Sequence, residues 1–68
     1  MNLVASEEFG RHFWITEDHD LMSCPTFVDG SPDLRYQDYV SDWTEPLTET
    51  EQGRLTAIKF QCFIKTRS

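Results

Sequence analysis

Nine aromatic side chains in a chain of only 68 residues set the main constraint on how this sequence can fold. A domain of this size buries only about 60% of the surface that its unfolded chain exposes, so its stability is marginal. Each buried aromatic ring removes a large apolar area from water and thereby compensates for the small core. The sequence therefore predicts one small folded domain over residues 1–68 rather than a disordered chain.

Two segments in the N-terminal half favour β-strands. Residues 11–17 are rich in aromatic and β-branched side chains, which suit a strand. Residues 21–28 form a second candidate, in which Pro25 favours an edge or bulged strand because proline donates no ladder hydrogen bond. The sequence Asp-His-Asp at residues 18–20 predicts a turn between them. A second turn is predicted at residues 29–32, where Asp, Gly, Ser and Pro follow one another.

The strongest helix signal lies at residues 32–43. Ser31 can cap the helix, and Pro32 suits the first helical position. The apolar face would then follow a 3.6-residue period through Tyr36, Tyr39, Val40 and Trp43. Pro46 would end the helix. A strand is the alternative, because tyrosine, valine and tryptophan also favour sheets.

The C-terminal segment has two interpretations. Apolar and polar side chains alternate over residues 54–65, which predicts a strand. Thr48 and Glu51 have the spacing of a capping box, so a helix over residues 49–64 is the alternative, although Gly53 follows closely. Together these elements predict an α+β domain: a small antiparallel sheet of about three strands with one helix packed on a face. A mostly β meander is the alternative architecture.

The charges are divided unevenly along the chain. Residues 17–53 carry ten carboxylates and one base, Arg35, which gives a net charge of −9. Residues 54–68 carry four bases and no carboxylate, which gives a net charge of +4. Such a division shapes the long-range field and favours the approach of positively charged partners. The overall charge of −6 disfavours direct binding to nucleic acid.

The acidic middle segment is the predicted binding surface. On a helix, Asp38 and Asp42 would lie about 5–6 Å apart at Cβ, and a row of such carboxylates can stand in for nucleic-acid phosphates. A groove lined with lysine and arginine would be attracted to it. The predicted contact charges and aromatic anchors are Asp33, Asp38, Asp42, Glu45, Glu49, Glu51, Tyr39 and Trp43. The alternative is that the acidic surface only keeps a small protein soluble.

Motifs for catalysis or cofactor binding are absent from the sequence. It contains no glycine-rich phosphate loop and no nucleophile elbow. His19 and Cys24 lie near several aspartates but lack the paired spacings of a zinc site. We therefore expect no enzyme activity, no metal and no cofactor. Cys24 and Cys62 are expected to be buried, reduced thiols of a cytoplasmic protein, because no signal peptide or membrane segment is recognisable.

No stretch of the chain matches a motif of a known family. In size, acidity and aromatic content it resembles the small inhibitors that phages and mobile elements deploy, such as anti-CRISPR, anti-restriction and DNA-glycosylase inhibitor proteins. The resemblance is one of general character and assigns no residue. It implies a stoichiometric inhibitor that occupies the basic groove of a nucleic-acid-handling protein. The alternative is a structural or regulatory interaction module, such as a homodimer that pairs through a sheet edge or an apolar surface.

Overall fold

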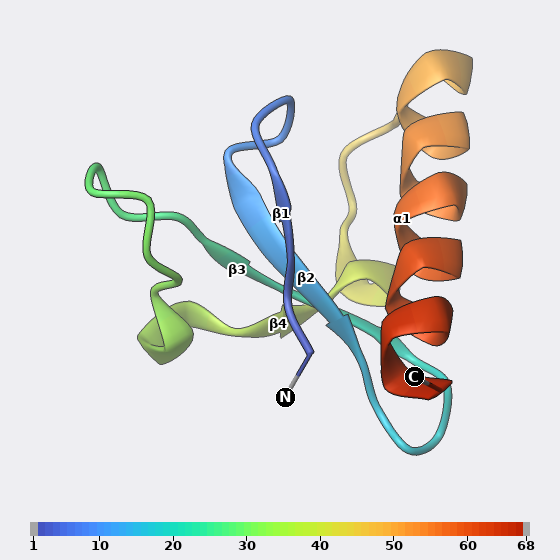
Figure 1. Cartoon of the computed structure of the whole chain (residues 1–68). Helices are drawn as coiled ribbons and strands as arrows, with labels where there is room; N and C mark the ends of the chain where they lie inside the picture. Colours follow the sequence, from blue (N-terminus) through green and yellow to red (C-terminus); the bar gives the residue numbers. More distant parts are fainter. Residues whose placement is uncertain (1, 68) are drawn as a thin grey trace.

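The computed structural model describes residues 2–67 and consists of one antiparallel sheet and one helix (Figure 1). Four strands follow one another in chain order across the sheet. They are β1 (Val4–Ser6), β2 (Arg11–Ile15), β3 (Leu21–Pro25) and β4 (Asp38–Tyr39). The helix α1 (Glu49–Arg67) packs against β1 and β2. The predicted α+β architecture is confirmed, with four strands in place of about three.

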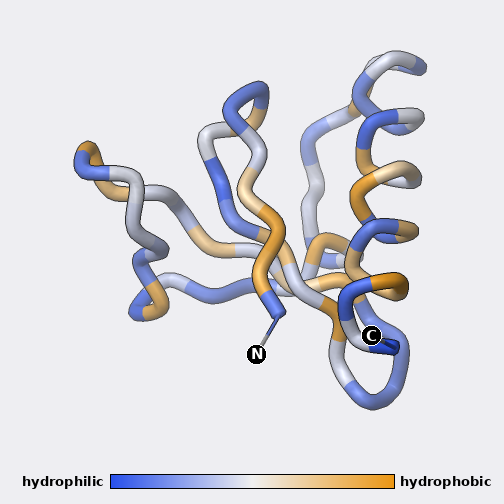
Figure 2. The backbone as a smooth tube through the Cα atoms, in the orientation of Figure 1, coloured by the Kyte–Doolittle hydropathy of each residue, from blue (hydrophilic) through white to orange (hydrophobic). Residues whose placement is uncertain are grey.

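β2 and β3 form where the sequence favours them, whereas β1 lies in a segment for which no strand was predicted. β2 pairs with β3 along its whole length, with Ile15 opposite Leu21, and with β1 over residues 11–13, with Val4 opposite Phe13. The predicted turn at residues 18–20 is confirmed, and His19 in it adopts a φ of 66°. Figure 2 shows this turn as a hydrophilic loop. The expectation of an edge strand at residues 21–28 is wrong, because β3 lies between β2 and β4; Pro25 is instead its last residue, where a missing ladder donor costs little.

The helix predicted over residues 32–43 is wrong. That segment contains two short 3₁₀ turns, Leu34–Tyr36 and Val40–Asp42, separated by β4. The predicted cap also shifts from Ser31 to Asp33, whose side chain accepts a hydrogen bond from the Arg35 backbone N–H but supports only a single turn. The tyrosine that was expected on a helix face instead pairs with β3, where Tyr39 lies opposite Met22. Pairing with the edge of β3 thus replaces the helix that the local pattern favoured. The alternative of a strand is correct for residues 38–39 only.

The strand predicted over residues 54–65 is also wrong, and the alternative of a helix is confirmed. The capping box is formed: the Thr48 backbone N–H donates to Glu51 Oε1 at 2.9 Å, and the Glu51 backbone N–H donates to Thr48 Oγ1 at 3.1 Å. Two reciprocal bonds satisfy N–H groups that a helix start leaves without partners. Gly53 is accommodated in the helix at a cost of about 1 kcal/mol relative to alanine.

The core lies between α1 and the facing side of the sheet. It consists of five buried residues, Val4, Phe13, Leu55, Ile58 and Cys62. The helix positions follow a spacing of three and four residues, so they form one face toward the strands. Side chains alternate between the two faces of a strand, so Trp14 and Cys24 lie on the opposite face, where both are also buried.

The connection between β3 and β4 extends away from α1 as an arm (Figure 1). The predicted turn at residues 29–32 lies at its tip, where Gly30 has a φ of 94° and the Asp29 carboxylate accepts two hydrogen bonds from Ser31. A positive φ costs glycine little because it has no Cβ. The arm therefore turns back on itself and delivers residues 38–48 to the sheet edge beside α1.

Candidate functional site

A cleft of about 460 Å³ opens where the start of β2 and the start of α1 meet residues 43–47, which join the second 3₁₀ turn (Val40–Asp42) to the helix. We call it the acidic cleft. Its apolar lining comes from Phe9, Trp43, Pro46 and Leu47, and its charged lining comes from Arg11, Asp42, Glu45 and Glu51. A volume in this range is typical of sites for small ligands or single side chains.

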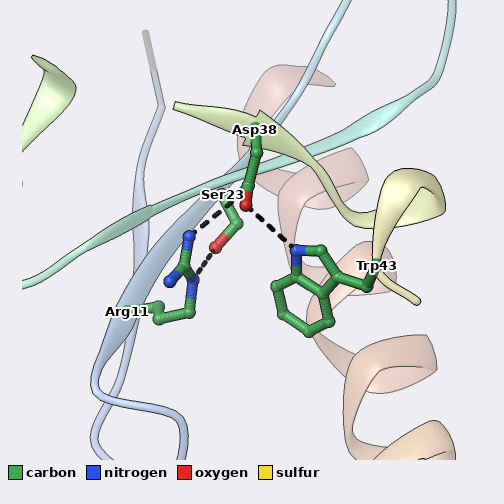
Figure 3. Close-up of polar contacts among 4 residues, drawn as sticks. All are labelled: Arg11, Ser23, Asp38 and Trp43. Atoms are coloured by element: carbon green, nitrogen blue, oxygen red, sulfur yellow. Dashed lines mark hydrogen bonds and ion pairs between the residues drawn. The ribbon is translucent and has the colours of Figure 1, made fainter. Parts of the chain in front are cut away.

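A hydrogen-bonded network holds the wall of the acidic cleft in place (Figure 3). Arg11 Nε donates to Ser23 Oγ at 2.6 Å, and Arg11 Nη2 donates to Asp38 Oδ1 at 3.1 Å. Trp43 Nε1 donates to the other carboxylate oxygen of Asp38 at 3.3 Å. The guanidinium of Arg11 also lies over the Trp43 ring, 5.5 Å from its centroid. Residues from three strands thus fix the orientation of one indole ring.

Aromatic contacts connect Trp43 to the core. Its ring centroid lies 6.4 Å from that of Phe9 and 6.4 Å from that of Phe13. Phe9 and Phe13 meet edge to face at 5.8 Å. Such pairs contribute roughly 0.5–1.5 kcal/mol each beyond the area they bury. The floor of the acidic cleft is therefore an extension of the hydrophobic core rather than a mobile surface loop.

The charge balance of the acidic cleft is strongly negative. Its one base, Arg11, is already paired with Asp38. Among residues 2–67, neither Asp42 nor Glu45 forms an ion pair. Glu51 accepts one backbone hydrogen bond as part of the capping box. An apolar floor with carboxylates at its rim suits a cation carried on an apolar stem, which describes the side chains of lysine and arginine.

The structure brings together only part of the predicted contact set. Asp42, Trp43, Glu45 and Glu51 line the acidic cleft, and Glu49 is exposed in the first turn of α1. The other predicted residues lie elsewhere. Asp38 belongs to the network behind Trp43, and Tyr39 extends from the opposite face of the sheet.

Asp33 does not line the acidic cleft and instead pairs with Arg35. Its side chain is only 10% exposed and binds Arg35 through both carboxylate oxygens, at 2.9 and 3.1 Å. Hydrogen bonds from Arg35 lower the pKa of Asp33 below its ordinary value of 3.8. Because its charge is already matched by Arg35, we assign Asp33 to the stability of the arm rather than to partner contact.

Phe9, Arg11, Pro46 and Leu47 were missed by the sequence reasoning. Phe9 lies in the turn before β2 and Arg11 is the first residue of β2. Both are more than thirty residues from Trp43, and no local pattern connects the two segments. Pro46 was interpreted only as a helix stop. The spacing of Leu47 before the capping box was an available signal, because an apolar residue at that position often packs on the first helical turn.

Both thiols lie outside the acidic cleft. Cys24 and Cys62 are free and fully buried, as expected for small core residues. Burial raises the pKa of each thiol above its ordinary value of 9.0. Within residues 2–67, no three histidine, cysteine, aspartate or glutamate side chains are grouped as a metal ion would require.

No protein-family model, curated protein or solved structure matches this chain. Function is therefore inferred from the acidic cleft and the surfaces around it. No helix among residues 2–67 has both the length and the apolar character needed to cross a membrane.

Proposed function

We propose that this protein is a small non-enzymatic binding protein that occupies a basic, nucleic-acid-binding surface of a partner protein. The observation that carries the proposal is the acidic cleft. Its carboxylates surround an aromatic floor, while its single base is held by Asp38. A lysine or arginine side chain of the partner would lay its stem on Trp43 and Phe9 and its charged head between Asp42 and Glu45.

The wider charge distribution supports the same partner class. Asp42, Glu45, Glu49 and Glu51 follow one another around the acidic cleft and the start of α1. Proteins that bind nucleic acid carry lysine and arginine in clusters along a groove. Complementary charge accelerates encounter and makes affinity depend on salt. Blocking such a groove would inhibit nucleic-acid binding, as in the phage-type anti-CRISPR, anti-restriction and DNA-mimic inhibitors that the chain resembles in general character.

A reducing compartment suits this proposal. Two buried thiols that form no disulfide with each other fit the cytoplasm, where proteins that process nucleic acids in bacteria are found. The proposed partner is thus an intracellular basic protein rather than a membrane or a nucleic acid.

The partner can be sought with the tagged protein in bacterial lysate at low and at high salt, with captured proteins identified by mass spectrometry. We expect one nucleic-acid-binding protein that is lost as salt rises. A salt-resistant partner without nucleic-acid binding, or a solution mass above the 8.0 kDa of one chain, would favour the interaction module or homodimer instead.

The acidic cleft itself is tested with a fluorescent nona-arginine peptide, which presents guanidinium groups without a folded partner. The double variant Asp42→Asn/Glu45→Gln should weaken binding by about tenfold, mainly through slower association. The matched control is Glu17→Gln/Asp18→Asn, which removes the same charge from the exposed β2–β3 turn. Equal loss in both double variants would show that only net charge matters and would reject a specific role for the cleft.

A further inference from the structure

The helix α1 carries a second apolar stripe on its outer side. Phe60 and Ile64 are 67% and 64% exposed, and the half-buried Phe63 lies between them. These side chains line a groove of about 310 Å³ that shares no residue with the acidic cleft. The full lining is Thr56, Lys59, Phe60, Phe63, Ile64 and Arg67. We call it the helix groove.

The spacing of the lining residues follows one side of a helix. Steps of three and four residues lead from Thr56 through Phe60 and Phe63 to Arg67, so the stripe runs along α1 for about three turns. The inner stripe of the same helix, Leu55, Ile58 and Cys62, is buried against the sheet. One helix therefore offers two apolar sides, and within this fold only the inner side is covered.

The wall of the helix groove is held in position by the sheet. The ring of His19, in the β2–β3 turn, meets the ring of Phe63 edge to face at 5.1 Å. Phe63 is thus fixed between α1 and the turn, while Phe60 and Ile64 remain exposed beside it. A preformed groove lowers the conformational entropy lost on binding.

The charged side chains that line the helix groove are both positive. Lys59 and Arg67 lie at its two ends, and no carboxylate lines it. Within residues 2–67, neither cation forms an ion pair. The helix groove thus has the opposite charge to the acidic cleft, which lies at the start of the same helix.

We infer that the helix groove docks an acidic amphipathic helix of a partner protein. Apolar side chains of that helix enter between Phe60, Phe63 and Ile64, and carboxylates on its flanks pair with Lys59 and Arg67. This is the helix-in-groove mode of recognition, in which apolar anchors give affinity and flanking charges select the partner.

A second copy of this chain fits the helix groove poorly. Parallel pairing of two α1 helices would place Lys59 opposite Lys59. Antiparallel pairing centred on Phe63 would place Lys59 opposite Arg67. Like charges that face each other across an interface are unfavourable, so both arrangements oppose self-association through this face.

The inference is tested with two synthetic amphipathic helical peptides that share one leucine stripe and differ only in glutamate or lysine at the flanking positions. Binding is followed by fluorescence anisotropy, and amide chemical shifts of the full chain locate the contact. We expect the glutamate peptide to bind at least about tenfold more tightly than the lysine peptide, with shifts along residues 56–67. Equal binding, absent binding or shifts elsewhere would overturn the inference.

Variants separate apolar contact from charge. Phe60→Ser/Ile64→Ser should reduce affinity for the glutamate peptide by at least about tenfold, because the anchors are lost. Ala57→Ser, an exposed change on the same helix outside the groove, is the control.

Lys59→Glu/Arg67→Glu should reverse the preference toward the lysine peptide. Circular dichroism confirms folding, and retained nona-arginine binding shows that the acidic cleft is intact, so this inference and the proposed function can fail separately.

Two further outcomes would contradict the inference directly. The first is concentration-dependent dimerisation, measured by sedimentation, that Phe60→Ser abolishes. The second is binding of the chain to phosphatidylserine vesicles without any binding of the glutamate peptide. Either result would assign the helix groove to a second copy or to an anionic lipid surface.

Discussion

Arg11 in β2 and Asp38 in β4 form an ion pair of 3.1 Å across the strand that separates them. The Arg11 guanidinium also contacts β3, where its Nε donates a hydrogen bond to the buried Ser23 hydroxyl. β4 has only two residues, so its ladder with β3 is short. The side-chain pair therefore fastens this edge of the sheet and, through the Asp38–Trp43 hydrogen bond, the floor of the acidic cleft.

Asp38→Ala should therefore destabilise the protein and loosen Trp43. The ion pair is partly exposed, with 45% of the Asp38 side chain accessible, so we expect a loss of about 1 kcal/mol in the free energy of unfolding. Urea unfolding followed by tryptophan fluorescence measures it. Asp18→Ala, in the exposed β2–β3 turn, is the matched control. Equal transition midpoints in the two variants would contradict this role for Asp38.

Thr48→Ala should destabilise α1 through loss of its cap. The Thr48 hydroxyl accepts the Glu51 backbone N–H, and replacing such a cap costs about 1 kcal/mol. Thr50→Ala is the control, because it makes the same chemical change at an exposed position in the first turn of α1, two residues after the cap. Glu51→Gln should cost less, since glutamine can also complete a capping box. Thermal unfolding followed by circular dichroism at the helix signal would rank the three variants.

The elements that depend on local chemistry could be predicted from the sequence. The composition of β2, the turn at residues 18–20 and the capping box each specify their own structure, and all are present. The C-terminal helix was assigned as a strand because Phe60 and Ile64 complete an alternating pattern with Ile58 and Cys62. Those two side chains are exposed rather than part of the core, which no local pattern could show.

Only the lining residues of the acidic cleft that come from the acidic middle segment could be predicted from the sequence. Asp42, Trp43, Glu45 and Glu51 are close in sequence, so charge and aromatic content identified them together. Phe9 and Arg11 join them through the order of strands, which is a property of the whole fold. The engagement of Asp38 with Arg11 also depends on that order. A helix at residues 32–43 would have left Asp38 and Asp42 on one exposed face. In the sheet, Asp38 pairs with Arg11 and Asp42 lines the acidic cleft.

Arg35→Gln should make the arm less resistant to acid. Hydrogen bonds from Arg35 lower the pKa of Asp33 below 3.8, so their contribution to stability is complete above 3.8 and is lost as pH falls through the lowered value. In the variant, the pKa of Asp33 should rise toward 3.8, and acid unfolding should begin at higher pH. Carboxyl NMR titration measures the change.

Asp29 provides an internal control for the Arg35→Gln titration. Its pKa is lowered by hydrogen bonds from Ser31, which Arg35 does not touch. The pKa of Asp29 should therefore stay low in the variant while that of Asp33 rises. A rise in both pKa values would show that the arm as a whole had rearranged. An unchanged pKa at Asp33 would show that Arg35 does not cause its lowering.

The two buried thiols should make the protein less stable in alkali. Burial raises the pKa of Cys24 and Cys62 above 9.0, so each folded thiol keeps its proton at a pH where the unfolded thiol has lost it. Their contribution to stability is complete below about pH 9 and is lost as pH rises through the folded pKa.

The free energy of unfolding in urea, measured across this pH range, should fall with a slope that Cys62→Ala reduces. Cys62→Ala will itself lower stability at neutral pH, because it leaves a cavity in the core, so the slope is the informative quantity. A slope that persists unchanged in both Cys62→Ala and Cys24→Ala would assign the alkaline loss to other groups.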